Sequence, residues 1–481
     1  MTEEPTIPLP PADGPATEPA TEPPPPPPRP RISPKGWSTA LVRSLLAFAI
    51  MLLAGELVAF LAVADSNLAS KEVVKIGGMA FFSFHHVGVQ TSVSDLDVGG
   101  LLGGLGGATG DLPAAGGIDA TVTLSIAALA FTLLAAWLLY RAGRAAAEAG
   151  GGSPMGRVLV GASVGVPYAV LALGLSFLLE FKFAAGPVGG VTVGVSTLGA
   201  LLWPLGLGYV FGGLGGLSTA RDDLAASRAG ARWLTVVAGA GRMLRWGLIV
   251  SSAGLLVLAA ANPDVTREYF SGIADAGAFD GFRLVFFTAV LGAPLLAVNG
   301  LLGGMLVPIV VGEYLSTSSI TLISLLRFPK GGPALEGLNP LAAVGGQPGV
   351  PFETGLARPE YFVFVVAALV AVILGGRYAA RRAGAAGAAS GAAHGAGAGA
   401  VFAVAAIFLA VLGSIGFKAE VDLGIIQQTV LGQLGPNLIY AGLLALAWGV
   451  IGGAIGGALG ADKPESERPG IAPGPSQIPA D

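Results

Sequence analysis

Long apolar segments alternate with short polar ones along most of the chain. A helix needs about 20 apolar residues to cross the hydrocarbon core of a bilayer. On this criterion the pattern predicts nine membrane-spanning helices, at residues 37–64, 120–140, 158–180, 196–216, 246–261, 284–304, 360–376, 400–416 and 437–459.

The positions of the basic residues require a tenth crossing. Arginine and lysine gather before the first segment, after the second, after the fourth and after the segment at 360–376. Basic loops stay on the cytoplasmic side of a membrane. These clusters share one side only if the chain also crosses at 305–326. We therefore predict an all-α polytopic protein of about ten helices, with both termini in the cytoplasm.

Composition supports the membrane interpretation. The chain of 481 residues is 53% hydrophobic and 12% charged, against about 25% charged in soluble domains. It contains no cysteine, which excludes disulfides, thiolate nucleophiles and cysteine-ligated metals. A net charge of −4 gives no basic field for nucleic acid, so the lipid bilayer is the expected partner.

The two ends of the chain differ from its centre. Residues 1–36 hold 14 of the 34 prolines and show no apolar periodicity, so we expect a disordered cytoplasmic tail. Residues 461–481 form a second such tail. The transmembrane domain is predicted at 37–460, with an extracytoplasmic loop at 65–119.

The loop at 65–119 carries two adjacent histidines, His85 and His86. Its alternating pattern predicts an extended segment near 79–93, in which adjacent side chains point to opposite faces. We therefore expect an interfacial strand and neither a metal site nor a cofactor site, although one histidine with Asp95 or Asp97 could bind a metal weakly. His394 is expected in a cytoplasmic loop, away from the other two.

Three polar residues lie within the apolar segments: Glu56, Asn299 and Glu313. Charged residues in a membrane are costly and often mark ion or proton pathways. The alternative is structural: Glu56 is protonated and hydrogen-bonded between helices, and Glu313 reaches water at a boundary. The sequence favours the structural alternative, because no basic partner stands within the spans.

Residues 180–216 resemble residues 416–457. Both segments have a Phe-Lys pair at a helix end, an amphipathic stretch, a proline and a glycine-rich helix. The pattern indicates an internal parallel repeat, as in some transporters. Glycines spaced four apart lie on one helix face and predict close helix packing. They are Gly208, Gly212 and Gly216 in the first copy and Gly452, Gly456 and Gly460 in the second.

Three segments resemble a known family. The stretches "VTVGVSTLGALLWPLGLGYVFGG", "LSIAALAFTLLAAWLLYRAGR" and "LGAPLLAVNGLLGGMLVP" are similar in pattern to the streptophobe family of hydrophobic actinobacterial membrane proteins. The resemblance covers about a third of the chain. It implies a plasma-membrane location, and it transfers no activity and no functional residue.

Two classes of function fit the sequence. The favoured one is a non-enzymatic envelope interaction or assembly protein, with other membrane or envelope proteins as partners. The alternative is a transporter or channel for a small solute or ion, supported by the span number, the repeat and the intramembrane carboxylates. An enzyme is disfavoured because the spans contain no catalytic constellation. If Glu56, Asn299 and Glu313 met in one polar cavity, the transporter would be favoured.

Overall fold

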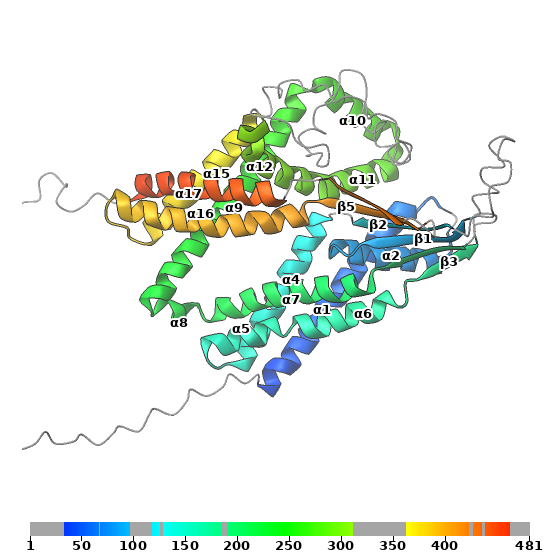
Figure 1. Cartoon of the computed structure of the whole chain (residues 1–481), viewed down its shortest axis with the longest axis horizontal. Coiled ribbons are helices and arrows are strands. Elements are labelled where there is room, and N and C mark those ends of the chain that lie inside the picture. The colour runs from blue at the N-terminus through cyan, green and yellow to red at the C-terminus, as the bar shows by residue number, and fades with distance from the viewer. Residues whose placement is uncertain are drawn as a thin grey trace, which may run out of the picture.

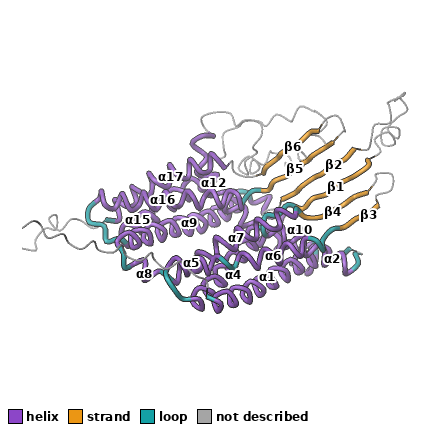
Figure 2. The backbone as a smooth tube through the Cα atoms, turned by 60° about the horizontal axis from the view of Figure 1, so that its bottom comes forward, coloured by secondary structure: helices purple, strands orange, loops and turns teal. Residues whose placement is uncertain are grey.

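The computed structural model describes residues 33–66, 68–96, 118–125, 128–184, 190–310, 362–422, 427–434 and 438–461. Two helical bundles lie side by side and share a β-sheet at one end (Figures 1 and 2). The first bundle consists of α1 (Pro34–Val63), α2 (Ser70–Phe84), α4 (Leu129–Gly150), α5 (Pro154–Ala162), α6 (Gly165–Ser176) and α7 (Thr197–Thr219). The second consists of α9 (Arg228–Ala261), α12 (Ala293–Val310), α15 (Phe362–Arg382), α16 (Ala388–Leu412) and α17 (Leu438–Gly460).

Short helices complete the chain between these elements. They are α8 (Arg221–Ala225), which links the bundles, and α10 (Pro263–Asp275), α11 (Gly277–Phe287) and the π-helical turn η2 (Thr288–Gly292), which precede α12.

Serine caps begin four of the helices, α1, α5, α7 and α9. In each, the serine hydroxyl accepts a hydrogen bond from the backbone N–H of a glycine three residues on, which satisfies a donor left free at a helix N-terminus. The pairs are Ser33 with Gly36, Ser153 with Gly156, Ser196 with Gly199 and Ser227 with Gly230. Helix α1 begins at Pro34, three residues before the first predicted span at residue 37. The rest of the tail predicted at 1–36, and residues 462–481, lie outside the described residues.

Six antiparallel strands form one sheet in the order β3-β4-β1-β2-β5-β6. Both bundles contribute strands, so the sheet joins them (Figure 2). The strands are β1 (Val89–Leu96), β2 (Ile118–Ser125), β3 (Phe181–Ala184), β4 (Gly190–Val195), β5 (Ile415–Asp422) and β6 (Gln427–Leu434). The prediction of a mainly helical chain with membrane-length helices is confirmed. The sheet is larger than the one short β-like segment expected near 79–93, because the other strands were taken for loops or for the end of a span.

The sheet has an apolar face and a polar face. Val89 of β1 lies opposite Leu124 of β2 and Val195 of β4, whereas the next residue, Gln90, lies opposite Thr123 and Gly194. Residues paired directly across antiparallel strands share a face. Val195 is buried, and Val89 packs against the core of the first bundle. The apolar face therefore fixes the register between the sheet and this bundle.

Within the described residues, eight helical segments are long and apolar enough to cross a membrane, which supports a membrane-spanning protein. They are Pro34–Val63, Pro154–Ser176, Thr197–Thr219, Arg228–Ala261, Gly277–Leu302, Val363–Arg382, Ala388–Leu412 and Ala441–Gly460. The span expected at 120–140 is not among these segments. Its first residues form the end of β2, and the helix that follows, α4, carries Arg141 and Arg144. Of the span expected at 305–326, residues 305–310 form the end of α12, and the rest lies outside the described residues.

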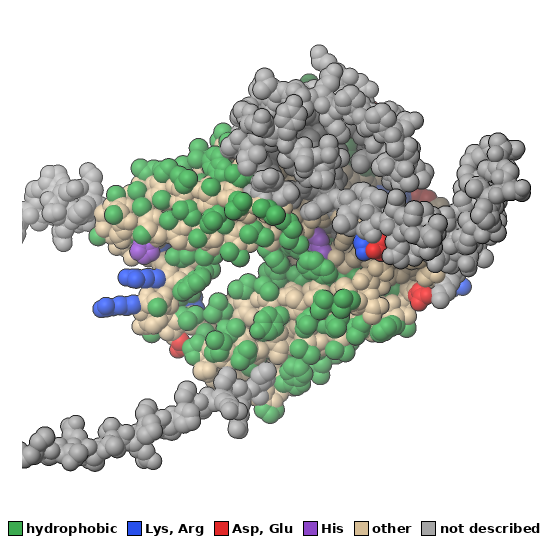
Figure 3. Space-filling view, in the orientation of Figure 1, with side chains coloured by type: hydrophobic (Ala, Val, Ile, Leu, Met, Phe, Trp, Pro, Cys, Tyr) green, Lys and Arg blue, Asp and Glu red, His purple; other side chains and the backbone are tan. Residues whose placement is uncertain are grey.

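The sides of both bundles are covered with apolar side chains, as the space-filling view shows (Figure 3). Leu53, Leu57 and Phe60 of α1 and Leu443 and Ile451 of α17 are among the exposed examples. A soluble protein seldom exposes so continuous an apolar surface. The same view shows an opening between the two bundles (Figure 3).

Candidate functional site

Two of the buried polar residues, His85 and His86, lie at the turn between α2 and β1, where the sheet meets the helices. His85 follows α2 directly and is fully buried. Its Nδ1 lies 2.7 Å from the carbonyl oxygen of Phe81, and its Nε2 lies 2.7 Å from the hydroxyl of Tyr168 in α6. Because a carbonyl can only accept, Nδ1 carries the proton and donates, and Nε2 accepts from Tyr168. Both ring nitrogens therefore have protein partners.

His86 adopts a left-handed backbone conformation with φ of 59°. This turn ends α2 and directs the chain into β1. The carbonyl of His86 accepts a hydrogen bond from Ser125 at the end of β2, and its ring centroid lies 5.7 Å from that of Trp203. The Nε2 atom is buried and has no hydrogen-bond partner among the described residues.

Both histidines are held neutral by their surroundings. Burial lowers the pKa of His85 to about 4, although the hydrogen bond to Phe81 opposes the shift. Burial likewise lowers the pKa of His86 to about 4, and a hydrogen bond to the backbone of Leu412, at the end of α16, opposes it. The turn formed by His85 and His86, the junction between the sheet and the helices, therefore contacts both bundles through uncharged imidazoles.

The sequence prediction for this region was partly wrong. Residues 79–84 belong to α2, and only residues 89–96 are extended. His85 and His86 consequently sit at a helix-to-strand turn, where they do not alternate as on a strand. His394 lies on α16 and not in a loop, with Nδ1 2.9 Å from the carbonyl oxygen of Ser390. Among the described residues, no group of three or more His, Cys, Asp or Glu side chains could hold a metal ion. The side chains of Asp95 and Asp97 lie outside the described part.

The three intramembrane polar residues do not come together in the part of the chain that is described. Glu56 of α1 lines a groove of about 340 Å³ with Lys71 and Lys75 of α2, next to leucines of α1 and α6. Its carboxyl group occupies the space where Gly77 has no side chain. Glu313 lies outside the described residues.

Asn299 has a structural position in the second bundle. Its amide nitrogen donates to the carbonyl of Leu295, 2.9 Å away in the same helix. It also donates to the carbonyl of Gly413, 3.0 Å away. Gly413 follows the end of α16, where carbonyls lack helical partners. Asn299 therefore ties α12 to that end, on a different bundle from Glu56.

The glycines of the first set let helices of the first bundle touch. A Cβ on Gly208 would lie less than 3 Å from the backbone of Gly165, and one on Gly212 would similarly meet Gly161. Gly216 faces the carbonyl of Arg157.

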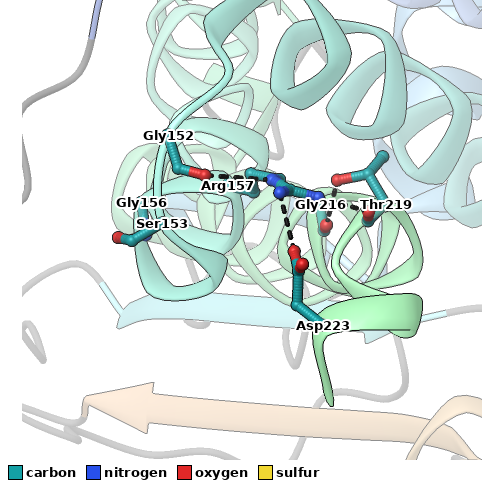
Figure 4. Close-up of polar contacts among 7 residues, drawn as sticks. All are labelled: Gly152, Ser153, Gly156, Arg157, Gly216, Thr219 and Asp223. Carbon is teal, nitrogen blue, oxygen red and sulfur yellow. Dashed lines mark hydrogen bonds and ion pairs between the residues drawn. The ribbon is translucent and has the colours of Figure 1, made fainter. Parts of the chain in front are cut away.

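The guanidinium of Arg157 connects backbone and side-chain groups at the end of the bundle opposite the sheet (Figure 4). That guanidinium donates to the carbonyls of Thr219 at 2.6 Å and Gly152 at 3.2 Å, and to the carboxylate of Asp223 at 2.7 Å.

The second glycine set faces a different neighbour. Gly456 and Gly460 contact the backbone of α15, and Gly452 contacts the side chain of Val372 in the same helix. A different set of glycines in α17, Gly449, Gly453 and Gly457, contacts α16. These contacts are the counterpart of those that the first set makes with α5 and α6. The two predicted sets are thus packing positions on different faces of α7 and α17.

Comparisons with known proteins identify no relative: no family, no curated protein and no solved structure matches the chain. The site therefore has to be interpreted from its own geometry. Sequence reasoning found one extended segment, which overlaps β1, and missed the other five strands although their signal was present. The alternation in "VQTSV", "ATVTL" and "VTVGV" is that of half-buried strands, but each stretch is short and lies beside a long apolar segment.

Proposed function

We propose that the protein is a non-enzymatic membrane protein of the cell envelope that binds a partner protein through its sheet. The edge strand β6 carries this proposal. Among the described strands β6 stands at one end of the order, and it is eight residues long. Its sequence, "QQTVLGQL", contains no charge and no proline. Edge strands are usually blocked by such residues, because a free edge pairs with other chains.

The opposite edge differs. Strand β3 has only four residues and includes Lys182, which are two common protections against edge pairing. The sheet thus has one protected edge and one edge suited to an added strand. Addition of an extended peptide to a sheet edge is an established mode of recognition, in which backbone hydrogen bonds provide affinity. We infer that an extended segment of another envelope protein pairs with β6.

The transporter alternative has less support. It depends on polar residues that converge on one pathway, and Glu56 and Asn299 belong to different bundles. The hydrogen bonds of Asn299 also give it a structural role.

We further propose a topology of ten spans, with both termini in the cytoplasm and the sheet outside, and an internal duplication. In the first half the strands β3 and β4 connect α6 to α7, and in the second half β5 and β6 connect α16 to α17. In each half an earlier helix, α4 or α15, packs on the last helix through a pair of glycines. Gly143 of α4 meets Gly212 of α7, and Gly376 of α15 meets Gly453 of α17. If Gly212 corresponds to Gly453, then Gly208 corresponds to Gly449. The sequence comparison had instead matched Gly208 with Gly452, about one helical turn further along α17. Membership of the streptophobe family remains a proposal based on sequence pattern.

Site-specific photo-crosslinking tests the binding proposal. A photoreactive amino acid at Thr429 of β6 should give one adduct of discrete mass in native membranes, whereas the same group at Thr192, inside the sheet, should not. The variant Leu431→Lys, which charges the edge, should abolish that adduct. Gln90→Lys adds the same charge to the interior strand β1 and should preserve it.

The opposite results would count against binding at β6. Equal labelling from Thr192, or an adduct that persists in Leu431→Lys, would refute the edge as the binding site. An adduct at twice the mass of the chain would indicate pairing of two copies instead of a different partner.

A further inference from the structure

A groove of about 740 Å³ lies between α1 and α4, toward the end of the first bundle that is far from the sheet. Three arginines line it: Arg43 of α1 and Arg141 and Arg144 of α4. Its volume is within the range of about 300–1,000 Å³ typical of small-ligand sites. No part of the proposed sheet interaction uses this groove.

The charges in the groove favour an anion. Glu148 is the acidic residue of the lining, and its carboxylate is 2.8 Å from Nε of Arg144. The guanidinium of Arg141 lies over the ring of Trp137, 5.1 Å from the centroid. Three cationic side chains against one carboxylate leave the lining with a net positive charge. Arginine is suited to phosphate, because its planar fork can donate two parallel hydrogen bonds.

The remaining lining is apolar and faces the membrane. Leu46 and Ile50 of α1 and Leu138 of α4 continue the groove away from the arginines. Leu46 is 50% exposed and Trp137 is 51% exposed, so both present apolar surface to the surroundings. Tryptophan and tyrosine are typical of the boundary between acyl chains and headgroups, and Trp137 and Tyr140 both line this groove.

We propose that the groove binds an anionic phospholipid. The phosphate lies among Arg43, Arg141 and Arg144, and the acyl chains run along Leu46, Ile50 and Leu138. A free anion would fill the basic end alone and leave the apolar part empty. A neutral lipid would leave the net positive charge of the lining without a counter-charge. Basic pockets between membrane helices bind anionic headgroups in this way.

The second bundle has arginines at the same end, and in its described part they contact a tyrosine. The guanidinium of Arg242 lies 4.9 Å from the ring centroid of Tyr378, and Nη1 of Arg382 donates to the hydroxyl of the same tyrosine at 2.8 Å. These two arginines and the neighbouring Arg381 provide a control set of equal charge.

Lipid binding can be measured on the full chain in nanodiscs of equal phosphatidylglycerol and phosphatidylcholine. Native mass spectrometry after mild release from the disc counts the retained lipids. The wild type should keep phosphatidylglycerol in preference to phosphatidylcholine. In the variant R43Q/R141Q/R144Q this preference should fall by up to roughly a hundredfold, because each arginine contributes roughly fivefold. The variant R242Q/R381Q/R382Q should keep it.

Two further measurements distinguish a bound lipid from a bound free anion. Ile50→Trp fills the apolar part of the groove without a change in charge and should also weaken retention. Inorganic phosphate in millimolar excess should not displace the lipid. The proposal would be overturned if R43Q/R141Q/R144Q and R242Q/R381Q/R382Q lost the preference for phosphatidylglycerol equally. Full displacement of the lipid by phosphate would also overturn it.

Photoreactive phosphatidylglycerol gives a test that needs no variant. On the wild-type chain it should label residues 41–50 and 134–148 above the rest of the lipid-facing surface. Uniform labelling of α1, α4, α9 and α15 would contradict the proposal even if the arginine variants failed to fold.

Discussion

The hydroxyl of Tyr168 lies 2.7 Å from Nε2 of His85, and both side chains are fully buried. This contact connects α6 to the turn between α2 and β1. Because Nδ1 of His85 donates to Phe81, Tyr168 is the donor for Nε2. The pair thus holds the start of the sheet against the first bundle with uncharged groups.

Tyr168→Phe should destabilise the protein, because it leaves Nε2 of His85 buried without a donor. An unsatisfied buried acceptor costs about 1–3 kcal/mol. Thermal unfolding in detergent should show a lower midpoint for this variant. Tyr209→Phe is the control, since Tyr209 is exposed and its loss should change little. If both variants unfold alike, the contact does not stabilise the fold.

Stability should fall as the pH drops from about 6.5 toward 4. The pKa values of His85 and His86 are about 4 in the folded protein, against 6.5 for a free side chain. Above pH 6.5 neither state binds these protons, so stability is complete. Below it the unfolded chain takes them up and the folded chain does not, which favours unfolding by up to about 3 kcal/mol for each histidine.

The variant His86→Asn isolates the contribution of one histidine to this pH dependence. Asparagine tolerates the left-handed backbone of that position and does not titrate. Unfolding midpoints measured at pH 7.5, 6.0 and 5.0 should depend less on pH in this variant than in the wild type. Identical slopes would show that His86 is accessible to protons in the folded state.

Alanine at Gly212 or Gly399 should disrupt helix packing. At both positions a Cβ would lie less than 3 Å from the backbone of a facing glycine, Gly161 or Gly449, so the helices would have to separate. Overpacking of this kind costs about 1–3 kcal/mol. Gly206→Ala is the matched control in α7, because nothing lies within 4 Å of its Cβ position. Thermal stability should fall for the first two variants only.

The proposed topology can be tested with single cysteines in this cysteine-free chain. A cysteine at Gln90 in the sheet, and others at Gly337 and Gly349, should react with a membrane-impermeant maleimide in whole cells. One at Gly384, in the turn between α15 and α16, should react only after the cells are opened. Labelling at Gly384 with protection at Gly337 and Gly349 would mean that the crossing at 305–326 is absent and the last spans are inverted.

A protease test applies to the N-terminal arm. If this arm is cytoplasmic, a tag placed before residue 33 should survive protease added to intact spheroplasts. Cleavage of the tag would reverse the orientation of α1 and, with it, that of the sheet.

Apolar length and small residues were sufficient to locate most of the helices. Segments such as 37–64 and 437–459 have no stable alternative to a membrane helix, because their backbone groups must be bonded internally in lipid. Glycines four apart likewise had to lie on one helix face, whatever their neighbour. The local sequence did not show which helix each set of glycines faces. Gly212 contacts α5, whereas Gly456 contacts α15.

The sheet and the junction were decided by tertiary structure. A short alternating stretch such as Val89–Val93 gains little alone, and its pairing with β2 and β4 requires residues about 30 and 100 positions away. The same holds for His85, whose partner Tyr168 is 83 residues distant. A local pattern shows that a histidine is present, but only the folded chain removes it from water and supplies its donor. The sequence therefore determined the membrane class and the helix-forming segments, and long-range packing decided the sheet, the neutral histidines and the arginine groove.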